Sequence, residues 1–416
     1  MTVSLRAFLD LLPYRLDQAL LTASRRQARV ARRRSRTASA PNMPAIPPRR
    51  LFVDVSVISR FDAGTGIQRV VRSLALELIA EARAQGWELQ FVAATRRRAF
   101  HRIAWSKDDC LTQPDAVEGR SGDVFVGLDY ALDAVRWHRG QLAALRRNGV
   151  KFWFLVHDLL PLERPDWFGA NTIVRYKAWL EIIAGVGDGF LCNSGQTEAH
   201  LCEVLRRDYG LTGGYATKVL SMGYSIKQPD SPDAADTALH RSNLSAPYFL
   251  MVGTLEPRKG HADILSAFDR LWAEGLPDAL VFVGRKGWQV DELSNFIKSH
   301  PLNGKKLFWF DDVSDRELAA IYAQSHGSIV ASYAEGFGLP LIEALGYGTP
   351  VLARDLPVFR SHEENGVHYF PADADTATLS RAVKKWIERV HAADIEIIRP
   401  ETSWSDSTRQ LLEAIK

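Results

Sequence analysis

The feature that most constrains the fold is a repeated alternation of short apolar runs with longer helical segments. In Lys151-Phe-Trp-Phe-Leu-Val156, for example, the five positions after the lysine are all apolar, as in a strand that helices cover on both faces. From Arg50 onward, such runs alternate with segments whose apolar residues recur at helical spacing. This alternation predicts parallel sheets in an α/β protein.

The alternation stops once and then restarts. Residues 226–246 contain Pro229 and Pro232 among many small or polar residues, so we expect an interdomain linker there. It would separate an amino-terminal domain over 50–225 from a carboxyl-terminal domain over 247–402, and about 403–416 would cross back to the first domain. Both domains are predicted to be doubly wound and Rossmann-like, and to face a central cleft.

The elements expected in each domain follow from these runs. In the first domain we expect a helix over 67–84, an N-cap at Ser194, and strands over 51–57, 91–94, 123–126, 151–156 and 189–192. In the second domain we expect strands over 248–252, 280–283, 306–310, 327–332 and 350–353. The helices expected between and after these strands span 261–274, 290–300, 315–325, 340–345 and 377–391.

The first 49 residues form a basic amphipathic extension and linker. Residues 1–50 hold 11 Arg, no Lys and two Asp, a net charge of +9, which leaves −6 for the remainder of a chain whose total is +3. Residues 1–36 carry an apolar stripe at helical spacing, and prolines mark the linker that follows. This stretch is suited to an anionic membrane surface, although a helix packed on the protein or a disordered tail would fit as well.

Several classes of protein are disfavoured. Nucleic-acid binding is not expected, because we find no basic folded domain with interleaved aromatic residues. The three cysteines lack metal-type or paired spacing, and no apolar run is long enough to span a membrane. The sequence also lacks a signal-peptide pattern, so we expect a cytoplasmic protein. This protein could also associate peripherally with the inner face of the plasma membrane.

Ligands of open α/β sheets bind beyond the carboxyl ends of the strands, and polar residues gather there. The cations of Arg258 and Lys259 follow a strand and precede a helix, as a diphosphate site would require. A solvated pair of loop charges would explain them equally well if they stood alone.

The segment Glu335-Gly-Phe-Gly-Leu-Pro-Leu-Ile-Glu343 favours the functional interpretation. Gly336 and Gly338 allow the backbone to approach a ligand closely. Glu343 lies one turn into the next helix and could accept hydrogen bonds from the two hydroxyls of a ribose. Glu335 could accept hydrogen bonds from the hydroxyls of a sugar. Stabilisation of the helix dipole, worth roughly 0.3–1 kcal/mol, would explain Glu343 but neither Glu335 nor the glycines.

These residues resemble a known family. Thr254–Gly260, Val283–Trp288 and Glu335–Glu343 are similar to segments of the retaining glycosyltransferases of family four, and the resemblance covers about residues 50–416. It implies the GT-B fold. The loop Thr65–Arg69 looks like that of mannosyl- and rhamnosyltransferases of bacterial surface polysaccharide synthesis. Gly260 departs from the asparagine that is frequent in the family.

The resemblance also implies roles for individual residues. Those near the reacting groups would be Glu335, His157, Arg258 and Lys259. The donor would be bound by Glu343, Gly66, Gly253, Arg258, Lys259, Phe337, Gly338 and Leu339, and the acceptor side would include Gly64, Thr65, Gln68 and Arg69. For His157, a satisfied histidine at a strand end is an equally good interpretation, and Asp158 is expected to cap a turn.

We therefore expect a retaining glycosyltransferase that moves mannose from GDP-mannose to a glycan or a polyprenyl-diphosphate-linked acceptor. No metal or other cofactor is expected, since two cations and a helix terminus can balance the leaving group. A UDP-sugar donor, a nucleotide-sugar 2-epimerase and a non-catalytic glycan-binding subunit are the alternatives. Glu335→Ala should lower transfer and leave the fold intact.

Overall fold

The computed structural model describes residues 48–105, 115–224, 244 and 246–416. These residues divide into two compact units. The first ends at Ser221 and also includes Ser405–Lys416, and the second is Met222–Trp404. The helical stripe expected over 1–36 lies outside the described residues, as does most of the linker expected over 226–246.

The first unit is built on a seven-stranded sheet in the order β3-β2-β1-β4-β5-β6-β7. All neighbouring strands are parallel except β2 and β3. The strands are β1 (Arg50–Asp54), β2 (Glu88–Thr95), β3 (Arg98–Arg102), β4 (Val124–Gly127), β5 (Lys151–Val156), β6 (Gly189–Cys192) and β7 (Ala216–Val219). The chain leaves the centre toward β2 and then returns to add β4 on the other side of β1, so the sheet has its topological switch point between β1 and β4.

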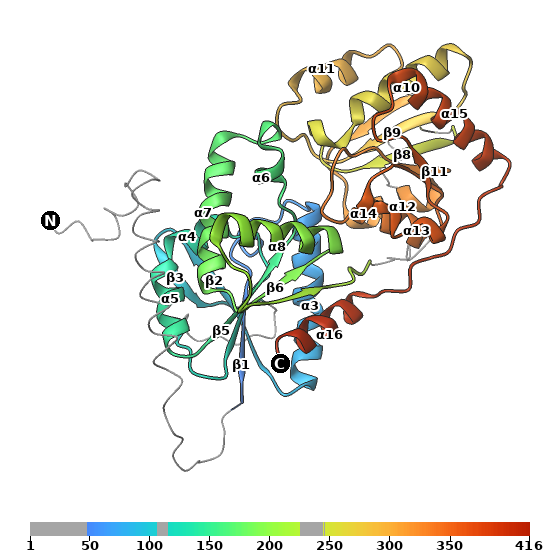
Figure 1. The fold of residues 1–416 in the computed structure, drawn as a ribbon. Coiled ribbons are helices and arrows are strands. Elements are labelled where there is room, and N and C mark those ends of the chain that lie inside the picture. The colour runs from blue at the N-terminus through green and yellow to red at the C-terminus, as the bar shows by residue number, and fades with distance from the viewer. Residues whose placement is uncertain (1–47, 106–114, 225–243, 245) are drawn as a thin grey trace. The chain divides into compact units, whose positions relative to one another are not determined.

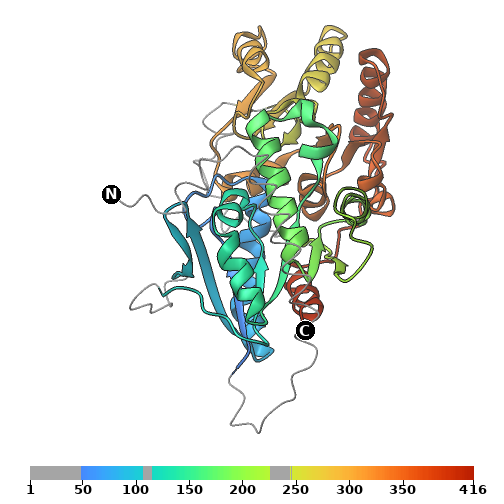
Figure 2. The ribbon, with the colours of Figure 1, turned by 60° about the vertical axis from the view of Figure 1, so that its left-hand side comes forward.

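Helices join these strands (Figures 1 and 2). They are α3 (Gly66–Ala84), α4 (Leu132–Trp137), α5 (Arg139–Arg147), α6 (Leu160–Glu163), α7 (Ala170–Val186), α8 (Gly195–Tyr209) and, from the chain's end, α16 (Trp404–Ala414). Thr65 and Gln68 form a capping box that starts α3, and Ser194 caps α8 as expected. Buried residues of α4, α5, α7 and α8 form one core with the central strands.

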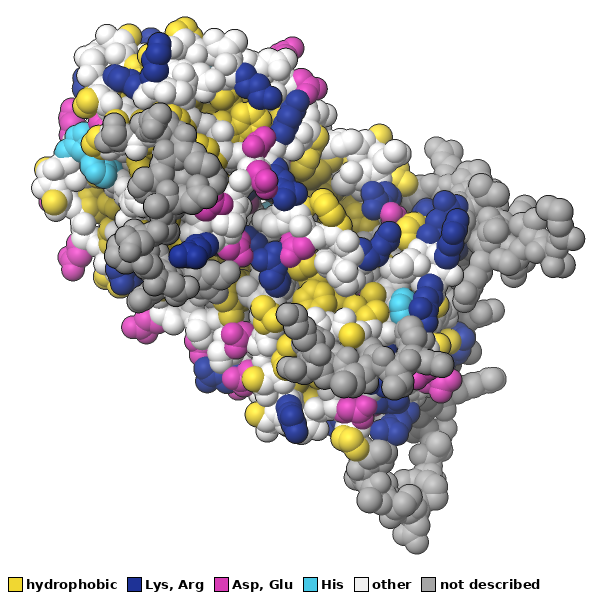
Figure 3. Space-filling model, turned by 180° about the vertical axis from the view of Figure 1, so that it is seen from behind, with side chains coloured by type: hydrophobic (Ala, Val, Ile, Leu, Met, Phe, Trp, Pro, Cys, Tyr) yellow, Lys and Arg dark blue, Asp and Glu magenta, His cyan; other side chains and the backbone are white. Residues whose placement is uncertain are grey.

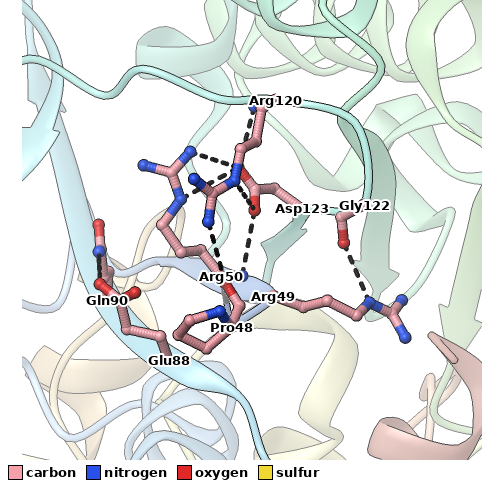
Figure 4. Close-up of polar contacts among 8 residues, drawn as sticks. All are labelled: Pro48, Arg49, Arg50, Glu88, Gln90, Arg120, Gly122 and Asp123. Carbon is pink, nitrogen blue, oxygen red and sulfur yellow. Dashed lines mark hydrogen bonds and ion pairs between the residues drawn. The ribbon is translucent and has the colours of Figure 1, made fainter. Parts of the chain in front are cut away.

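An ion cluster closes the amino-terminal edge of this sheet (Figure 4). Asp123 is buried just before β4, and the Arg50 guanidinium at the start of β1 lies 2.6 Å from its carboxylate. The backbone N–H groups of Arg50 and Arg120 donate to the same carboxylate, at 3.1 and 2.9 Å. The buried charge is thus balanced and hydrogen-bonded, which is the condition for its burial to be tolerated.

The second unit is built on a six-stranded, fully parallel sheet in the order β10-β9-β8-β11-β12-β13. Its strands are β8 (Tyr248–Val252), β9 (Ala279–Val283), β10 (Leu307–Phe310), β11 (Gly327–Val330), β12 (Val351–Arg354) and β13 (His368–Phe370). The order again reverses at the centre, between β8 and β11. The two doubly wound sheets confirm the expected α/β class.

Helices cover both faces of the second sheet. They are η3 (Pro257–Lys259), α10 (His261–Ala273), α11 (Asp291–Ser299), α12 (Asp315–Gln324), α13 (Leu339–Tyr347), α14 (Pro357–Arg360), η4 (Glu363–Asn365) and α15 (Thr376–His391). One core packs α10 and α15 against Phe249 and Met251, and the other packs α12 and α13 against Tyr248 and Leu250. Because alternate residues of β8 serve both cores, the strand is apolar throughout.

Several sequence predictions need correction. The first strand ends at Asp54 rather than residue 57, because the N–H groups of Val57 and Ile58 turn to donate to Asp129. The strand expected over 327–332 ends at Val330, and the helix expected from residue 340 begins at Leu339. The short strands β3, β7 and β13 were not predicted at all.

The face of the molecule drawn in Figure 3 carries mixed charge. On the face drawn in Figure 3, basic and acidic side chains of the described residues are interspersed with apolar ones. This agrees with the sequence, in which the basic excess belongs to residues 1–50. Within the described ranges, no helix combines the length and the apolar character needed to cross a bilayer.

Candidate functional site

The switch point of the second sheet brings Arg258, Lys259 and Glu335 together. β8 and β11 are neighbours, so the loops that follow them emerge side by side. The first loop carries Arg258 and Lys259 in η3, and the second carries Glu335. A direct backbone hydrogen bond joins the loops, from the N–H of Tyr333 to the carbonyl of Arg258 at 2.8 Å.

Glycines allow this close approach of loops. Gly260 has φ +72°, and a Cβ there would lie 2.4 Å from the carbonyl oxygen of Ala331. Gly284, after β9, has φ +152°, and its Cβ would lie 2.0 Å from the carbonyl oxygen of Gly253. Both positions therefore require glycine. The departure from the family's frequent asparagine at position 260 thus has a local cause, since no side chain fits against Ala331 in this chain.

Glu335 is the shared partner of both cations. Its carboxylate lies 3.0 Å from Nη1 of Arg258 and also binds Nζ of Lys259. The hydroxyl of Ser332 donates to it at 2.6 Å. Only 9% of the Glu335 side chain is exposed, so these contacts are largely desolvated and correspondingly strong.

This environment sets the protonation state of Glu335. Burial alone would raise the pKa of the carboxyl group, but Lys259 and Arg258 overcome that effect and lower the pKa to about 2. Glu335 is therefore a carboxylate at neutral pH and a weak base. Its chemistry is to hold charge and to accept hydrogen bonds, rather than to remove a proton.

A second carboxylate balances the cluster. Glu256 is buried, and its Oε1 lies 2.6 Å from Nε of Arg258. The two cations of the loop after β8 thus face two carboxylates, Glu256 from the same loop and Glu335 from the loop after β11. Sequence reasoning missed Glu256 and Ser332, although both lie in the loops after β8 and β11 that the strand-end rule singles out.

Arg354 stabilises the start of the loop that carries Glu335. This guanidinium, at the end of β12, is only 2% exposed. Nε donates to the carbonyl oxygen of Ala331 at 3.0 Å, Nη1 to that of Ala372 at 2.7 Å, and Nη2 to Asp263 at 2.8 Å. The ring of Tyr333 packs 3.9 Å from its carbon Cζ. Arg354 was also missed, because nothing in the sequence distinguishes it from a surface arginine.

The helix α13 and the residues just before it include further positions that were predicted to bind the donor. Gly338 precedes it with φ +99°, and a Cβ there would lie 2.4 Å from the ring of Phe359. No side chain caps the amino terminus of α13, Pro340 has no N–H, and the N–H of Leu341 donates to the carbonyl of Gly338 at 3.0 Å. Glu343 is buried one turn further on, and the hydroxyl of Tyr322 donates to it at 3.2 Å.

In the first unit, the predicted acceptor loop is held by its own side chains. Thr65 caps α3, and the amide of Gln68 donates to the carbonyl of Phe61 at 2.8 Å. Oε1 of Gln68 accepts the N–H of Ala63 at 2.7 Å. These bonds give Thr65 and Gln68 a structural role, and binding of an acceptor by the loop from Gly64 to Arg69 stays a prediction.

His157 lies directly after β5 and is buried. Nε2 donates to the carbonyl oxygen of Leu128 at 3.2 Å, and burial lowers the pKa of the imidazole to about 4. The ring is thus neutral at pH 7 and anchored at a strand end. The neighbouring Asp158 accepts the N–H of Leu160 at 3.2 Å, the turn-capping role expected for it.

A buried carboxyl pair at the switch point of the first sheet was not predicted. Asp54 ends β1 and Asp129 follows β4. Asp129 accepts N–H groups from Val57 at 2.6 Å and Ile58 at 2.8 Å. Burial, together with the charge of Asp129, raises the pKa of Asp54 from 3.8 to about 7. The pair fixes the loop that leads to Gly64.

This raised pKa makes stability depend on pH. Folding favours the protonated form of Asp54 between about pH 4 and 7, so its contribution is largest below pH 4 and falls as the pH rises to 7. We expect Asp54→Asn to flatten the decline of the melting temperature over that window. Thermal melts at closely spaced pH values, with the exposed Asp115→Asn as a control, would measure it, and parallel curves for Asp54→Asn and wild type would contradict it.

Comparison with known proteins agrees with this geometry. Residues 235–394 match the family model described as glycosyl transferases group 1. The chain is 35% identical over 364 residues to the serotype-specific mannosyltransferase WbdA of Escherichia coli. That match covers 82% of this chain but 43% of WbdA, so the chain spans less than half the length of the relative.

Solved structures show the same fold. Sucrose-phosphate synthase from Thermosynechococcus elongatus superposes with a TM-score of 0.59 at 19% identity, covering 88% of this chain and 96% of that one. WaaG, a glycosyltransferase involved in lipopolysaccharide biosynthesis, superposes with a TM-score of 0.55 at 14% identity, covering 88% and 95%. Residues 235–394 are therefore similar to the group 1 glycosyl transferases, and the two Rossmann-like units of the chain have the GT-B fold.

Proposed function

We propose that this chain is a retaining hexosyltransferase that moves mannose from GDP-mannose to a glycan during synthesis of a bacterial surface polysaccharide. The observation that carries the proposal is the cluster of Arg258, Lys259 and Glu335 at the switch point of the second sheet. The choice of mannose rests on the likeness to WbdA, a mannosyltransferase.

The cluster suggests how the donor is received. Arg258 and Lys259 both face Glu335, and an anionic diphosphate would compete with that carboxylate for the same two cations. If the diphosphate took over these contacts, the cations would stabilise the leaving group as charge develops on it. Glu335 would then be released to accept hydroxyls of the hexose.

Glu343 supplies a matching site for the nucleoside. Its buried carboxylate lies one turn inside α13, beyond the amino terminus that would receive phosphate oxygens. A ribose diol could donate two hydrogen bonds to it, with Tyr322 holding the carboxylate in place at 3.2 Å. The proposal thus assigns separate carboxylates to the sugar and to the ribose.

The low pKa of Glu335 supports a front-face mechanism. At about 2, that pKa makes the carboxylate a poor base for the acceptor hydroxyl. The proton would instead pass to the leaving phosphate as the new glycosidic bond forms on the same face of the sugar. Glu335 would orient the hexose and stabilise the positive charge of an oxocarbenium-like state, and no metal is required.

The acceptor and the location are further parts of the proposal. A polyprenyl-diphosphate-linked glycan fits an enzyme at the cytoplasmic face of the plasma membrane. Residues 1–36, with their apolar stripe and arginine run, would make the peripheral contact.

A donor screen tests the proposal. We expect GDP-mannose to raise the melting temperature more than UDP-glucose or UDP-galactose, and by an amount that grows with concentration. Ligand at 100 times Kd stabilises by about 2.7 kcal/mol. Mass spectrometry should then show mannose added to an acceptor glycan. A larger rise of the melting temperature with a UDP-sugar would overturn the assignment of GDP-mannose as the donor. An epimer formed from the donor in the absence of an acceptor would overturn the assignment of the reaction as sugar transfer.

A further inference from the structure

Three side chains converge at the amino-terminal edge of the second sheet. Asp278 immediately precedes β9, His326 immediately precedes β11, and His391 is the last residue of α15. One ligand atom of each lies within 4.8 Å of those of the other two. Among the residues that the structure describes, no other three His, Cys, Asp or Glu side chains are grouped in this way.

Asp278 differs from two other aspartates that immediately precede strands. Asp123 and Asp188 are paired with arginines, Arg50 at 2.6 Å and Arg146 at 3.0 Å. Asp278 is only 1% exposed, yet its neighbour is the imidazole of His391, with Nε2 at 3.0 Å from Oδ1. Its second oxygen, Oδ2, has no hydrogen-bond partner among the described residues.

A buried carboxylate with one unsatisfied oxygen is costly unless something else binds it. The imidazole rings of His326 and His391 lie 6.3 Å apart between centroids and are nearly perpendicular, at 84°. Both histidines are exposed, so their rings can turn, whereas Asp278 is fixed. One rigid anionic ligand and two adjustable neutral ones form a set that transition metals prefer over Mg²⁺ or Ca²⁺.

We propose that Asp278, His326 and His391 bind a divalent transition-metal ion, with Zn²⁺ as the preferred ion. Tetrahedral coordination at about 2.1 Å places ligand atoms about 3.4 Å apart, so a pair of ligand atoms at the 4.8 Å limit must close by about 1.4 Å. Rotation of the exposed histidines supplies that movement. Three protein ligands leave a fourth position, which would hold water.

The site lies at the opposite edge of the sheet from the donor cluster. Arg258 and Glu335 follow the carboxyl ends of β8 and β11, whereas His326 precedes the amino end of β11. The metal would therefore join three segments that are distant in sequence and stabilise the second unit. It would not take part in sugar transfer.

The experiment uses the full-length chain, stripped with a chelator and then titrated with Zn²⁺. We expect one ion to bind per chain and to raise the melting temperature. His326→Gln and His391→Gln should each weaken binding by at least about tenfold, because the loss of even an outer-shell partner of a metal ligand typically costs about 10–100-fold. Co²⁺ should give an absorption band that both variants lose.

His200→Gln is the matched control. His200 is a half-exposed histidine, and its Nδ1 lies 2.5 Å from Glu163, but the two belong to no such cluster of three. The Zn²⁺ affinity of the His200→Gln variant should equal that of the wild type. Failure of the wild-type chain to bind Zn²⁺, or equal binding by His326→Gln and His391→Gln, would overturn the proposal. Because both histidines are exposed, the variants should remain folded in chelator, which circular dichroism would verify.

Discussion

Replacing Glu335 by glutamine is expected to lower the turnover of sugar transfer by about 10²–10³-fold, the usual cost of removing one charge-stabilising group from an active site. The variant keeps the size of the side chain and removes its negative charge. The carboxylate touches both Arg258 and Lys259, so those two cations lose a shared counter-ion. In the proposed mechanism the hexose also loses its anionic acceptor.

The same variant should separate turnover from donor binding. Without the carboxylate, Arg258 and Lys259 meet less competition for a diphosphate, so GDP should bind as tightly as to the wild type or more tightly. Lys259→Met should instead weaken both GDP binding and turnover. Lys286→Met is the control, because Lys286 lies in the loop after β9 but is exposed and pairs only with Asp291 among the contacts described. Isothermal titration with GDP and initial-rate kinetics would give the two quantities.

Two results would contradict this assignment. Wild-type turnover in Glu335→Gln would remove Glu335 from the reaction. A parallel loss of GDP affinity and turnover would show that the carboxylate supports the diphosphate rather than competing with it.

The ion cluster also changes what is expected of Glu335→Ala. From the sequence, that substitution should leave the fold intact. In the structure, Glu335 neutralises two partly buried cations, and breaking a buried pair typically costs about 3–5 kcal/mol. The cluster could not be anticipated, because it depends on β8 and β11 being neighbours and no spacing in the sequence reveals strand order.

Elements with a strong local pattern were predicted well. β5, β6 and β8 match their apolar runs residue for residue, and α3 is set by an apolar stripe and a capping box. The missed strands β3, β7 and β13 lie at sheet edges and are three to five residues long. Their pairing depends on a neighbouring strand more than on their own composition, so the sequence signal is weak.

Site residues divide in the same way. Arg258, Lys259 and Glu335 were predicted because they follow strands in segments with a family resemblance, and the structure brings all three into contact. Arg354 and the pair of Asp54 and Asp129 could not be found from pattern alone. Their character comes from burial and from partners more than 70 residues away, such as Asp263 for Arg354 and Asp129 for the N–H of Val57.

Arg354→Met is expected to lower the melting temperature of the chain by about 6–20 °C, from a loss of about 3–5 kcal/mol. The guanidinium satisfies the carbonyl oxygens of Ala331 and Ala372 and the carboxylate of Asp263. Methionine fills a similar volume but donates no hydrogen bond, so all three acceptors lose their buried partner. The melting temperature of Arg354→Lys should lie between those of the wild type and Arg354→Met, because an ammonium group cannot reach three acceptors in one plane.

Turnover should fall as well, even where the variant is fully folded. Ala331 begins the loop that carries Glu335, and Arg354 donates a hydrogen bond to its carbonyl oxygen. Arg360→Met is the control: Arg360 lies in the same unit, but its pairs with Asp355 and Glu363 are exposed and should contribute little. Differential scanning calorimetry and kinetics at 20 °C below each variant's own melting temperature would test both effects. If Arg354→Met has the melting temperature of the wild type, the loop is held by its own backbone. If the variant has a lower melting temperature but normal turnover, Arg354 contributes to stability and not to catalysis.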